Sequence, residues 1–360
     1  MTAPSTAIRL NPFKGMAGPE GTPVPWSPCG RILSERPNFT LDPLYHAGCY
    51  YVQDSSAMYV GHVFGKHAEG ESLRVLDLCA APGGKTTDLA ARLRERCGDG
   101  FTLVANEVIK SRASVLRDNV GIWGDRNVVV TSVDPAVIGR ELKGWFDVIV
   151  ADVPCSGEGM FRKDPRAEEE WSPAVVDLCA ARQKRILADV WPALRQGGLL
   201  VYSTCTYEEK ENDDNLEWAA SELGGEIISP EAEFEEHGVR LTRRGNLLRA
   251  GEVPGEGQWV GALRKSSPAS SSRKPVIPGV LPAEETDRAL AIGYVPECPV
   301  VELSLSDARK YLHRDTLCFP DEPKGLLIAS YLSHPLGFMK NIGSRCNNLL
   351  PRNRRILMDV

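Results

Sequence analysis

The sequence lacks the patterns that mark membrane, secreted and zinc-binding proteins. Its 360 residues contain no apolar run of the roughly 18 residues that a membrane-spanning helix needs. The N-terminus carries no apolar core of signal-peptide length. The ten cysteines form no Cys-x-x-Cys pair, and His46, which stands three residues ahead of Cys49, has no second such pair to complete a zinc site. We therefore expect a cytoplasmic protein that binds no metal and has no disulfide framework.

The chain also lacks the net positive charge that commonly accompanies nucleic-acid binding, since its formal net charge is -6. The charge is unevenly spread, however. The C-terminal stretch 340–355 contains no acidic residue and five basic ones, namely Lys340, Arg345, Arg352, Arg354 and Arg355. A local excess of positive charge is enough for a phosphate-binding face, so RNA stays open as a partner. The alternative is a solvated basic tail.

Apolar runs of strand length alternate with helical patterns through the middle of the chain. We predict strands at 74–80, 102–107, 127–134, 146–153 and 199–205, and helices at 85–96, 111–124 and 173–196. Such alternation predicts an α/β fold, a doubly wound parallel sheet with helices on both faces. Ligands of these sheets bind beyond the carboxyl ends of the strands.

The rest of the chain divides by composition. Residues 1–60 are rich in Pro and Gly and predict irregular structure, whereas 61–265 carry the predicted α/β domain. Residues 266–278 are Ser- and Pro-rich, which is typical of a linker. Short apolar runs separated by Gly, Pro and Asn predict a smaller, strand-rich domain over 279–360. We expect the protein to be a monomer.

A turn of small residues follows the first predicted strand of the α/β domain and opens a helix. It comprises Cys79, Ala80, Ala81, Pro82, Gly83, Gly84 and Lys85. Small residues allow close approach of a ligand, and the free N–H groups of a helix N-terminus attract a carboxylate or phosphate. Because the turn matches neither GxGxxG nor a P-loop, it favours an amino-acid-bearing cofactor over a nucleotide phosphate.

Acidic residues end several of the predicted strands. Glu107 is placed to accept hydrogen bonds from a ribose, and Asp134 to meet the adenine end of the same ligand. Asp77 and Asp152 complete the series along one sheet edge. Taken singly, Glu107 and Asp134 could instead be helix caps or surface residues.

Two cysteines end two predicted strands, Cys155 in Asp-Val-Pro-Cys and Cys205 in Ser-Thr-Cys-Thr. A thiolate that adds to carbon 6 of a pyrimidine makes carbon 5 nucleophilic, and a second thiol can help to reverse the addition. Asp152 can hydrogen-bond the base edge, and Lys85 is the nearest candidate for lowering a thiol pKa. These residues predict a cofactor-dependent enzyme that acts on a pyrimidine base.

The loop that follows Cys155 offers contacts for a nucleic acid. Phe161 could stack on a base, and Arg162 and Lys163 could meet phosphates. A solvated loop is the alternative for these residues.

Together the three motifs, DLCAAPGGK, DVPCSGEGMFRKDP and STCTYEEKEN, resemble the Nop/Sun family of RNA cytosine-5 methyltransferases. The resemblance implies a Rossmann-like methyltransferase that binds S-adenosylmethionine through residues 79–85, Glu107, Asp134 and Asp152. It implies Cys205 as the nucleophile, Cys155 as an aid to product release and Asp152 as a contact to the cytosine. The DNA enzymes use a nucleophile at the Cys155 position instead, so the two roles can be tested.

The C-terminal stretch PLGFMKNIGSRCNNLLPRNRRI resembles the branch of the family that acts on bacterial small-subunit ribosomal RNA, and it implies a PUA-like RNA-binding domain. The expected partner is ribosomal RNA or the small subunit. Residues 1–60 resemble a shortened N-terminal RNA-binding segment of that branch. A transfer RNA substrate, or an inactive RNA-binding assembly factor, are the alternatives.

Overall fold

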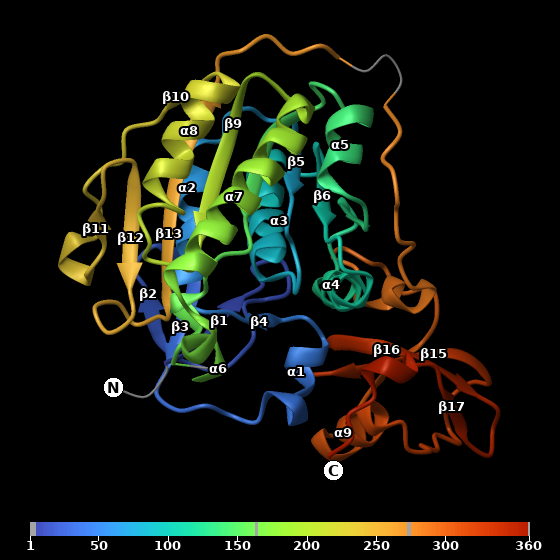
Figure 1. Cartoon of the computed structure of the whole chain (residues 1–360). Coiled ribbons are helices and arrows are strands. Elements are labelled where there is room, and N and C mark those ends of the chain that lie inside the picture. Colours follow the sequence, from blue (N-terminus) through green and yellow to red (C-terminus); the bar gives the residue numbers. More distant parts are fainter. Residues whose placement is uncertain (1–4, 163–164, 272–274, 359–360) are drawn as a thin grey trace.

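A nine-stranded sheet forms the centre of the protein, whose computed structural model describes residues 5–162, 165–271 and 275–358 (Figure 1). The strands follow the order β11-β12-β13-β9-β8-β5-β6-β7, and β10 pairs with β13. Five neighbouring strands are parallel: β5 (Leu73–Asp77), β6 (Phe101–Asn106), β7 (Val128–Thr131), β8 (Phe146–Asp152) and β9 (Leu194–Thr204). This arrangement confirms the predicted α/β fold.

The other edge of the sheet is antiparallel, which the sequence did not predict. It consists of β10 (Gly225–Ile227), β11 (Arg240–Leu241), β12 (Gly245–Arg249) and β13 (Gly257–Lys265). Residues of β13 are almost all buried, because this strand is central rather than peripheral. The short connections between these strands leave no room for crossover helices, so antiparallel pairing follows.

Helices cover both faces of the sheet (Figure 1). One face carries α5 (Pro135–Glu141), α7 (Pro173–Val190) and α8 (Asp213–Leu223), and the other α2 (Tyr59–His67), α3 (Gly84–Cys97) and α4 (Lys110–Trp123). Local signals set the helix starts. The Ser172 hydroxyl accepts a hydrogen bond from the Val175 amide (3.3 Å) ahead of a proline at the first helical position of α7. A short helix, α6 (Pro165–Glu170), precedes α7.

The N-terminal segment forms a sheet of its own rather than the irregular structure expected from its composition. Its strands are β1 (Thr6–Leu10), β2 (Thr22–Val24), β3 (Ser27–Leu33) and β4 (Tyr50–Val52), antiparallel in the order β2-β3-β1-β4. The helix α1 (Pro43–His46) precedes β4. The Pro- and Gly-rich stretches that suggested irregularity lie largely between strands, where turns require such residues.

The C-terminal part is strand-rich, as predicted. It contains β14 (Val300–Glu302), β15 (Gly325–Tyr331), β16 (His334–Asn341), β17 (Cys346–Asn348) and the helix α9 (Leu305–His313). The apolar run at 354–360 does not add a strand within the described residues, although Ile356 is buried.

The N-terminal and C-terminal sheets share one hydrophobic core, although they lie at opposite ends of the chain (Figure 1). Ile8, Leu10 and Tyr50 pack in the same cluster as Leu303, Tyr311 and Met339. The Arg309 guanidinium donates to the Leu41 carbonyl (3.0 Å) across the same junction. The C-terminal sheet is therefore anchored on the N-terminal one, not merely tethered by the linker.

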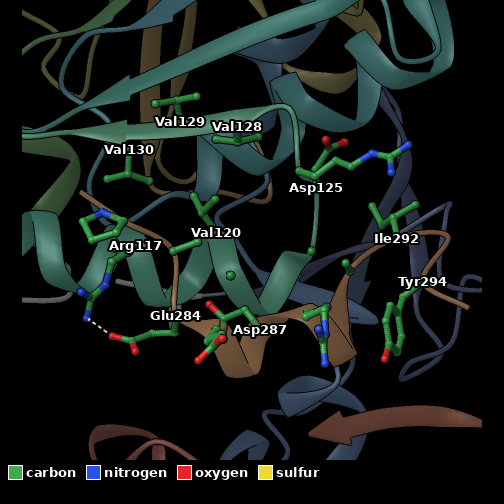
Figure 2. A pocket seen from close by; sticks show the side chains of 18 of the residues that line it. Arg117, Val120, Asp125, Val128, Val129, Val130, Glu284, Asp287, Ile292 and Tyr294 are labelled. Carbon is green, nitrogen blue, oxygen red and sulfur yellow. Dashed lines mark ion pairs between the residues drawn. The ribbon is translucent and has the colours of Figure 1, made fainter. Parts of the chain in front are cut away.

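The chain that follows the linker attaches to the free edge of the central sheet. Ser132 and Leu281 amides donate to the Gly279 and Val130 carbonyls (3.0 and 2.9 Å), so this segment extends the sheet beyond β7. Together with α4 it encloses a cavity of about 810 Å³ with a valine-lined floor, in which Arg117 and Glu284 form an ion pair (3.0 Å; Figure 2). This cavity lies apart from the motif residues.

Over the described residues, no helix is both long and apolar enough to cross a membrane.

Candidate active site

Most of the small-residue turn, together with Lys85, Asp152 and Cys205, lines one cavity at the carboxyl ends of β5, β8 and β9, whereas Gly83 and Cys155 do not line it. The cavity has a volume of about 370 Å³, within the range of small-molecule sites. Its walls come from five separate parts of the chain. The lining residues are Tyr51, Val52, Gln53, Asp54, Ala57, Cys79, Ala80, Ala81, Pro82, Gly84, Lys85, Asp152, Gly159, Cys205, Glu256, Gly257 and Gln258.

The small-residue turn lies between β5 and α3, as the sequence predicts. The Ala80 amide donates to the Asn106 carbonyl (2.9 Å), which ties the turn to the neighbouring strand β6. Gly83 has a φ of 114°, a conformation that favours glycine, and α3 begins at the next residue. Behind the turn, Asp77 accepts a hydrogen bond from the Thr86 hydroxyl (2.6 Å), and burial raises the pKa of Asp77 to about 7. Asp77 thus supports the turn rather than lining the cavity.

The N-terminal sheet supplies a second wall of the cavity, which the sequence did not reveal. Arg9 is 1% exposed and donates through Nε to the Gln53 side-chain oxygen (2.8 Å). A guanidinium can only donate, so this bond fixes the orientation of the Gln53 amide. The amide nitrogen of Gln53 is left buried without a hydrogen-bond partner in the described part of the chain.

This wall fits the carboxylate of an amino-acid cofactor. The first N–H groups of α3 have no acceptor within the helix and favour an anion. Gln53 packs beside Gly84 at that helix start, where an added Cβ would lie 3.6 Å from its amide carbon. A buried unpaired donor and a helix N-terminus on one cavity wall suit a carboxylate group.

Lys85 and Asp152 form an ion pair at the cavity floor, with the ammonium and a carboxylate oxygen 2.8 Å apart. Burial alone would lower the pKa of Lys85, but the Asp152 carboxylate raises it above its ordinary value. The second Asp152 oxygen accepts from the Ser203 hydroxyl (2.7 Å) and the Gln258 amide (3.0 Å). The carboxylate is held in one orientation at the end of β8, with its side chain 26% exposed.

The two cysteines lie in direct contact, with their sulfur atoms 2.9 Å apart. Each follows the end of its strand, Cys155 three residues after β8 and Cys205 directly after β9. Because β8 and β9 are parallel neighbours, their carboxyl ends bring the two thiols together. Both side chains are partly accessible.

The two thiols differ in acidity. The hydrogen bond from Cys155 lowers the pKa of Cys205 below its ordinary value, and the Lys85 charge acts in the same direction against the effect of burial. The same hydrogen bond, together with burial, raises the pKa of Cys155 well above its ordinary value. The first proton that the pair loses therefore leaves Cys205, and the remaining proton is held by Cys155, which suits Cys205 to the role of nucleophile.

We expect iodoacetamide to alkylate Cys205 faster than Cys155 at pH 7, because only the thiolate reacts. As pH falls, the Cys205 rate should persist below the ordinary thiol range, since its pKa is lowered, whereas Cys155 should react only at high pH. Peptide mass spectrometry of samples quenched at successive times measures both rates. Faster alkylation of Cys155 would contradict the assignment.

Glu107 directly follows β6, as predicted, whereas Asp134 stands three residues beyond the end of β7, and neither lines the cavity. Glu107 is 2% exposed, accepts from the Ile109 amide (3.0 Å) and pairs with Arg112 (3.1 Å). Asp134 is exposed and caps α5 by accepting from the Ala136 amide (2.9 Å). Their roles toward ribose and adenine stay predictions. Asp134 makes the helix-cap contact that was the alternative for it.

The loop after Cys155 packs over the cavity. The Gly159 amide donates to the Cys205 carbonyl (2.7 Å), and the Glu158 carboxylate accepts from the Thr206 hydroxyl (2.7 Å). Arg162 forms an ion pair with buried Glu256 (3.2 Å), so its guanidinium is already engaged by a carboxylate. The predicted phosphate contact of Lys163 falls outside the described residues.

The five C-terminal basic residues differ in their exposure to solvent. Arg354 is only 7% exposed and binds Asp287 (2.6 Å), with Asp118 of α4 at 3.9 Å. This corrects its assignment to a phosphate-binding face, because two carboxylates hold the side chain inside the protein. The other four, Lys340, Arg345, Arg352 and Arg355, are exposed. Lys340 lies on β16, and the other three stand next to β17 or beyond it.

Several residues of the site were not predicted from the sequence. Gln53, Glu256 and Gln258 line the cavity although none stands in the three motifs. Glu211 belongs to a motif, yet its contact with the Cys155 loop depends on the fold. Among the described residues, no cluster of three His, Cys, Asp or Glu side chains could hold a metal ion.

A mixed α/β sheet with helices on both faces and a small-residue turn at a cavity beyond the strand ends is the architecture of Rossmann-like methyltransferases. A methyltransferase homolog from Pyrococcus horikoshii has a similar fold, with a TM-score of 0.60 and 26% identity over 73% of this chain and 87% of that one. A second structure, NSun6 from Pyrococcus horikoshii with SFG, gives a TM-score of 0.54 at 24% identity over 64% of this chain and 57% of that one.

Three family models match successive parts of the chain: the N-terminal domain of 16S rRNA methyltransferase RsmF at residues 1–55, 16S rRNA methyltransferase RsmB/F at 66–236, and the methyltransferase RsmF PUA domain at 298–356. The chain belongs to the RsmB/F methyltransferase family. The match confirms the predicted family and the PUA-like C-terminal domain.

Among curated proteins, the ribosomal RNA small subunit methyltransferase F of Cronobacter sakazakii is 38% identical over 273 residues, which cover 72% of this chain and 55% of that protein. The Klebsiella pneumoniae protein of the same name is 37% identical over 272 residues, or 72% of this chain and 56% of that protein. The chain thus spans about half the length of the curated relatives that it matches.

Proposed function

We propose that the protein methylates carbon 5 of a cytosine in 16S ribosomal RNA, with S-adenosylmethionine as the methyl donor. The observation that carries this proposal is the pair of thiols 2.9 Å apart, beside the Lys85–Asp152 ion pair at the cofactor cavity. Methyl transfer to a nitrogen or oxygen needs no thiol nucleophile. Attack by carbon 5 of a pyrimidine does, because the ring must first be activated at carbon 6.

The proposed reaction begins with the Cys205 thiolate. Its sulfur forms a bond to carbon 6, and the electrons of the carbon 5–carbon 6 double bond become available at carbon 5. Asp152 holds the base edge and favours protonation at ring nitrogen 3 as the addition occurs. The cofactor supplies an electrophilic methyl group on a sulfonium.

Product release reverses the addition. A base takes the proton of carbon 5, the electrons of that C–H bond restore the double bond of the ring, and the bond between Cys205 and carbon 6 breaks with its electrons returning to the Cys205 sulfur. Cys155 contacts the departing sulfur and assists this step with its thiol proton. The base reaches the cavity out of its stack, as enzymes that modify a base require.

For RNA we propose a binding surface that includes the exposed residues of the predicted basic stretch, Lys340, Arg345, Arg352 and Arg355, in the PUA domain. The curated relatives carry the name of ribosomal RNA small subunit methyltransferase, which supports the small subunit as the substrate. Arg162 would reach RNA only by leaving Glu256.

Product analysis tests the function. We expect purified protein and isotope-labelled S-adenosylmethionine to place label in 16S RNA of small subunits that lack the modification, and nuclease digestion to release it as 5-methylcytidine. Bare transfer RNA and naked 16S RNA serve as comparison substrates. Label in transfer RNA alone would move the substrate to the alternative class, and a labelled N4-methylcytidine would contradict the thiol mechanism.

A further inference from the structure

The two thiols lie in different electrostatic surroundings. On the side of Cys205 stands the Lys85–Asp152 ion pair, whose ammonium favours a thiolate and whose carboxylate opposes one. On the side of Cys155 lies Glu211, which is fully buried and only six residues beyond Cys205 in the chain. One oxygen of the Glu211 carboxylate accepts hydrogen bonds from the Ser156 amide (3.1 Å) and the Gln183 side chain (2.7 Å). The pair is therefore electrostatically asymmetric.

A buried hydrogen-bond network connects Glu211 to both neighbours of Cys155, Pro154 and Ser156. Gln183 also donates to the Pro154 carbonyl (3.0 Å), so the backbone is held on either side of the cysteine. The Tyr202 hydroxyl donates to the Glu211 carbonyl (2.6 Å) and lies 3.1 Å from the Gln183 oxygen. Burial raises the pKa of Tyr202 well above its ordinary value, so its hydroxyl keeps the proton that it donates.

We propose that Glu211 is a positioning residue that holds Cys155 against Cys205 and keeps the proton of the pair on Cys155. The proposal rests on the thiol roles given above and extends them to a residue that touches neither the substrate nor the cofactor. Its physical basis is that a second negative charge on Cys155 would face the Glu211 carboxylate inside the protein, where such repulsion is weakly screened.

The charges on the Cys205 side do not add to this asymmetry, because Asp152 disfavours a thiolate on Cys205 and its ion-pair partner Lys85 favours one. The asymmetry comes from the hydrogen bond between the two thiols and from Glu211 on the Cys155 side. Glu158 is bonded to the Thr206 hydroxyl and the Tyr207 amide (2.6 Å), and Arg162 is paired with Glu256. Burial raises the pKa of Glu211 above its ordinary value, and the hydrogen bonds from Ser156 and Gln183, which favour the carboxylate, reduce that rise.

The test is the pH profile of iodoacetamide alkylation, read separately for each thiol by peptide mass spectrometry. In Glu211→Gln, which keeps the side-chain shape, we expect the Cys155 profile to move to lower pH. The preference for Cys205 at pH 7 should fall about tenfold, because a tenfold larger acid dissociation constant of Cys155 gives about tenfold more of its thiolate. Glu211→Asp retains the negative charge, so its alkylation profiles should stay close to those of the protein without a substitution.

Asp213→Asn provides the matched control. Asp213 is a buried carboxylate of the same segment that accepts from the Thr242 hydroxyl (2.8 Å) and the Arg244 amide (2.6 Å), without contact to either cysteine. An unchanged thiol preference in Glu211→Gln, or an equal loss in Asp213→Asn, would overturn the proposal. So would a loss in Glu211→Asp as large as in Glu211→Gln, because that pattern indicates packing rather than charge.

Alkylation needs neither RNA nor cofactor, which separates this proposal from the proposed function. If the expected profile is observed but the RNA product is not 5-methylcytidine, the role of Glu211 stands and the substrate assignment fails. If methylation proceeds as proposed while the alkylation profile of Glu211→Gln coincides with that of the protein without a substitution, only the proposed role of Glu211 fails.

Discussion

Cys205→Ala is expected to abolish methyl transfer, with a loss in turnover on the order of 10⁴-fold or more, as found for other covalent nucleophiles. Without the sulfur no bond forms at carbon 6, so carbon 5 stays unreactive toward the methyl donor. Cofactor binding should change little, because the turn at the start of α3 and the Gln53 wall are untouched. A radiolabel transfer assay under single-turnover conditions measures the loss.

Cys179→Ala is the matched control for this change. Cys179 is a buried cysteine of α7, 6% exposed and away from the cavity, so its loss removes a thiol without touching the pair. Activity in Cys205→Ala within about tenfold of that of Cys179→Ala would show that Cys205 is not the nucleophile, since the loss of a covalent step costs far more.

Asp152→Asn should lower turnover roughly 10²- to 10⁴-fold, the usual contribution of a positioned acid or base. The uncharged asparagine side chain cannot favour protonation of the cytosine ring, and it leaves the Lys85 ammonium without a counter-charge. The hydrogen bonds from Ser203 and Gln258 can still be accepted by the amide oxygen, so the side chain should keep its place. Turnover at saturating RNA and cofactor is the measurement.

Asp147→Asn separates this effect from the loss of an ion pair. Asp147 lies at the opposite end of the same strand and pairs with Arg74 (3.4 Å) and Arg195 (2.7 Å). We expect it to reduce stability slightly and to leave turnover within about twofold, since ion pairs near the surface contribute little. Equal losses of turnover in the two variants would contradict a chemical role for Asp152.

Much of the site was predictable because its motifs follow strands. A buried apolar run followed by a small-residue turn identifies both the strand and the ligand-binding end of the sheet, so Lys85, Asp152, Cys155 and Cys205 could be placed at one edge from the sequence alone. The structure brings these four together, with the ion pair and the sulfur contact as direct evidence.

The second wall of the cavity was not predictable, because it depends on contacts between distant parts of the chain. Gln53 reaches the cavity through a bond to Arg9, 44 residues away in sequence, and Gln258 reaches Asp152 across 106 residues. Gln258 lies on β13, whose antiparallel insertion beside β9 carries no signal in the alternation of strands and helices. No local pattern encodes such pairings.

The charge pattern of the sequence placed Arg354 on a phosphate-binding face, but the structure pairs it with carboxylates inside the protein. In the sequence it stands in an acid-free basic stretch, but its partners Asp118 and Asp287 come from α4 and from the segment beneath the free sheet edge. A buried ion pair of this kind is invisible until the C-terminal domain is placed beside α4. Lys340 and Arg345, from the same stretch, have the exposed side chains that a charged surface predicts.

The most direct test of the covalent mechanism is the trapping of RNA on Cys155→Ala. This variant keeps the nucleophile but loses the thiol that assists release, so we predict an RNA-linked protein that survives a denaturing gel, with the nucleotide attached to Cys205 by peptide mass spectrometry. The double variant Cys155→Ala, Cys205→Ala should give none. An adduct that instead forms in Cys205→Ala and maps to Cys155 would reverse the two roles and contradict the proposed mechanism.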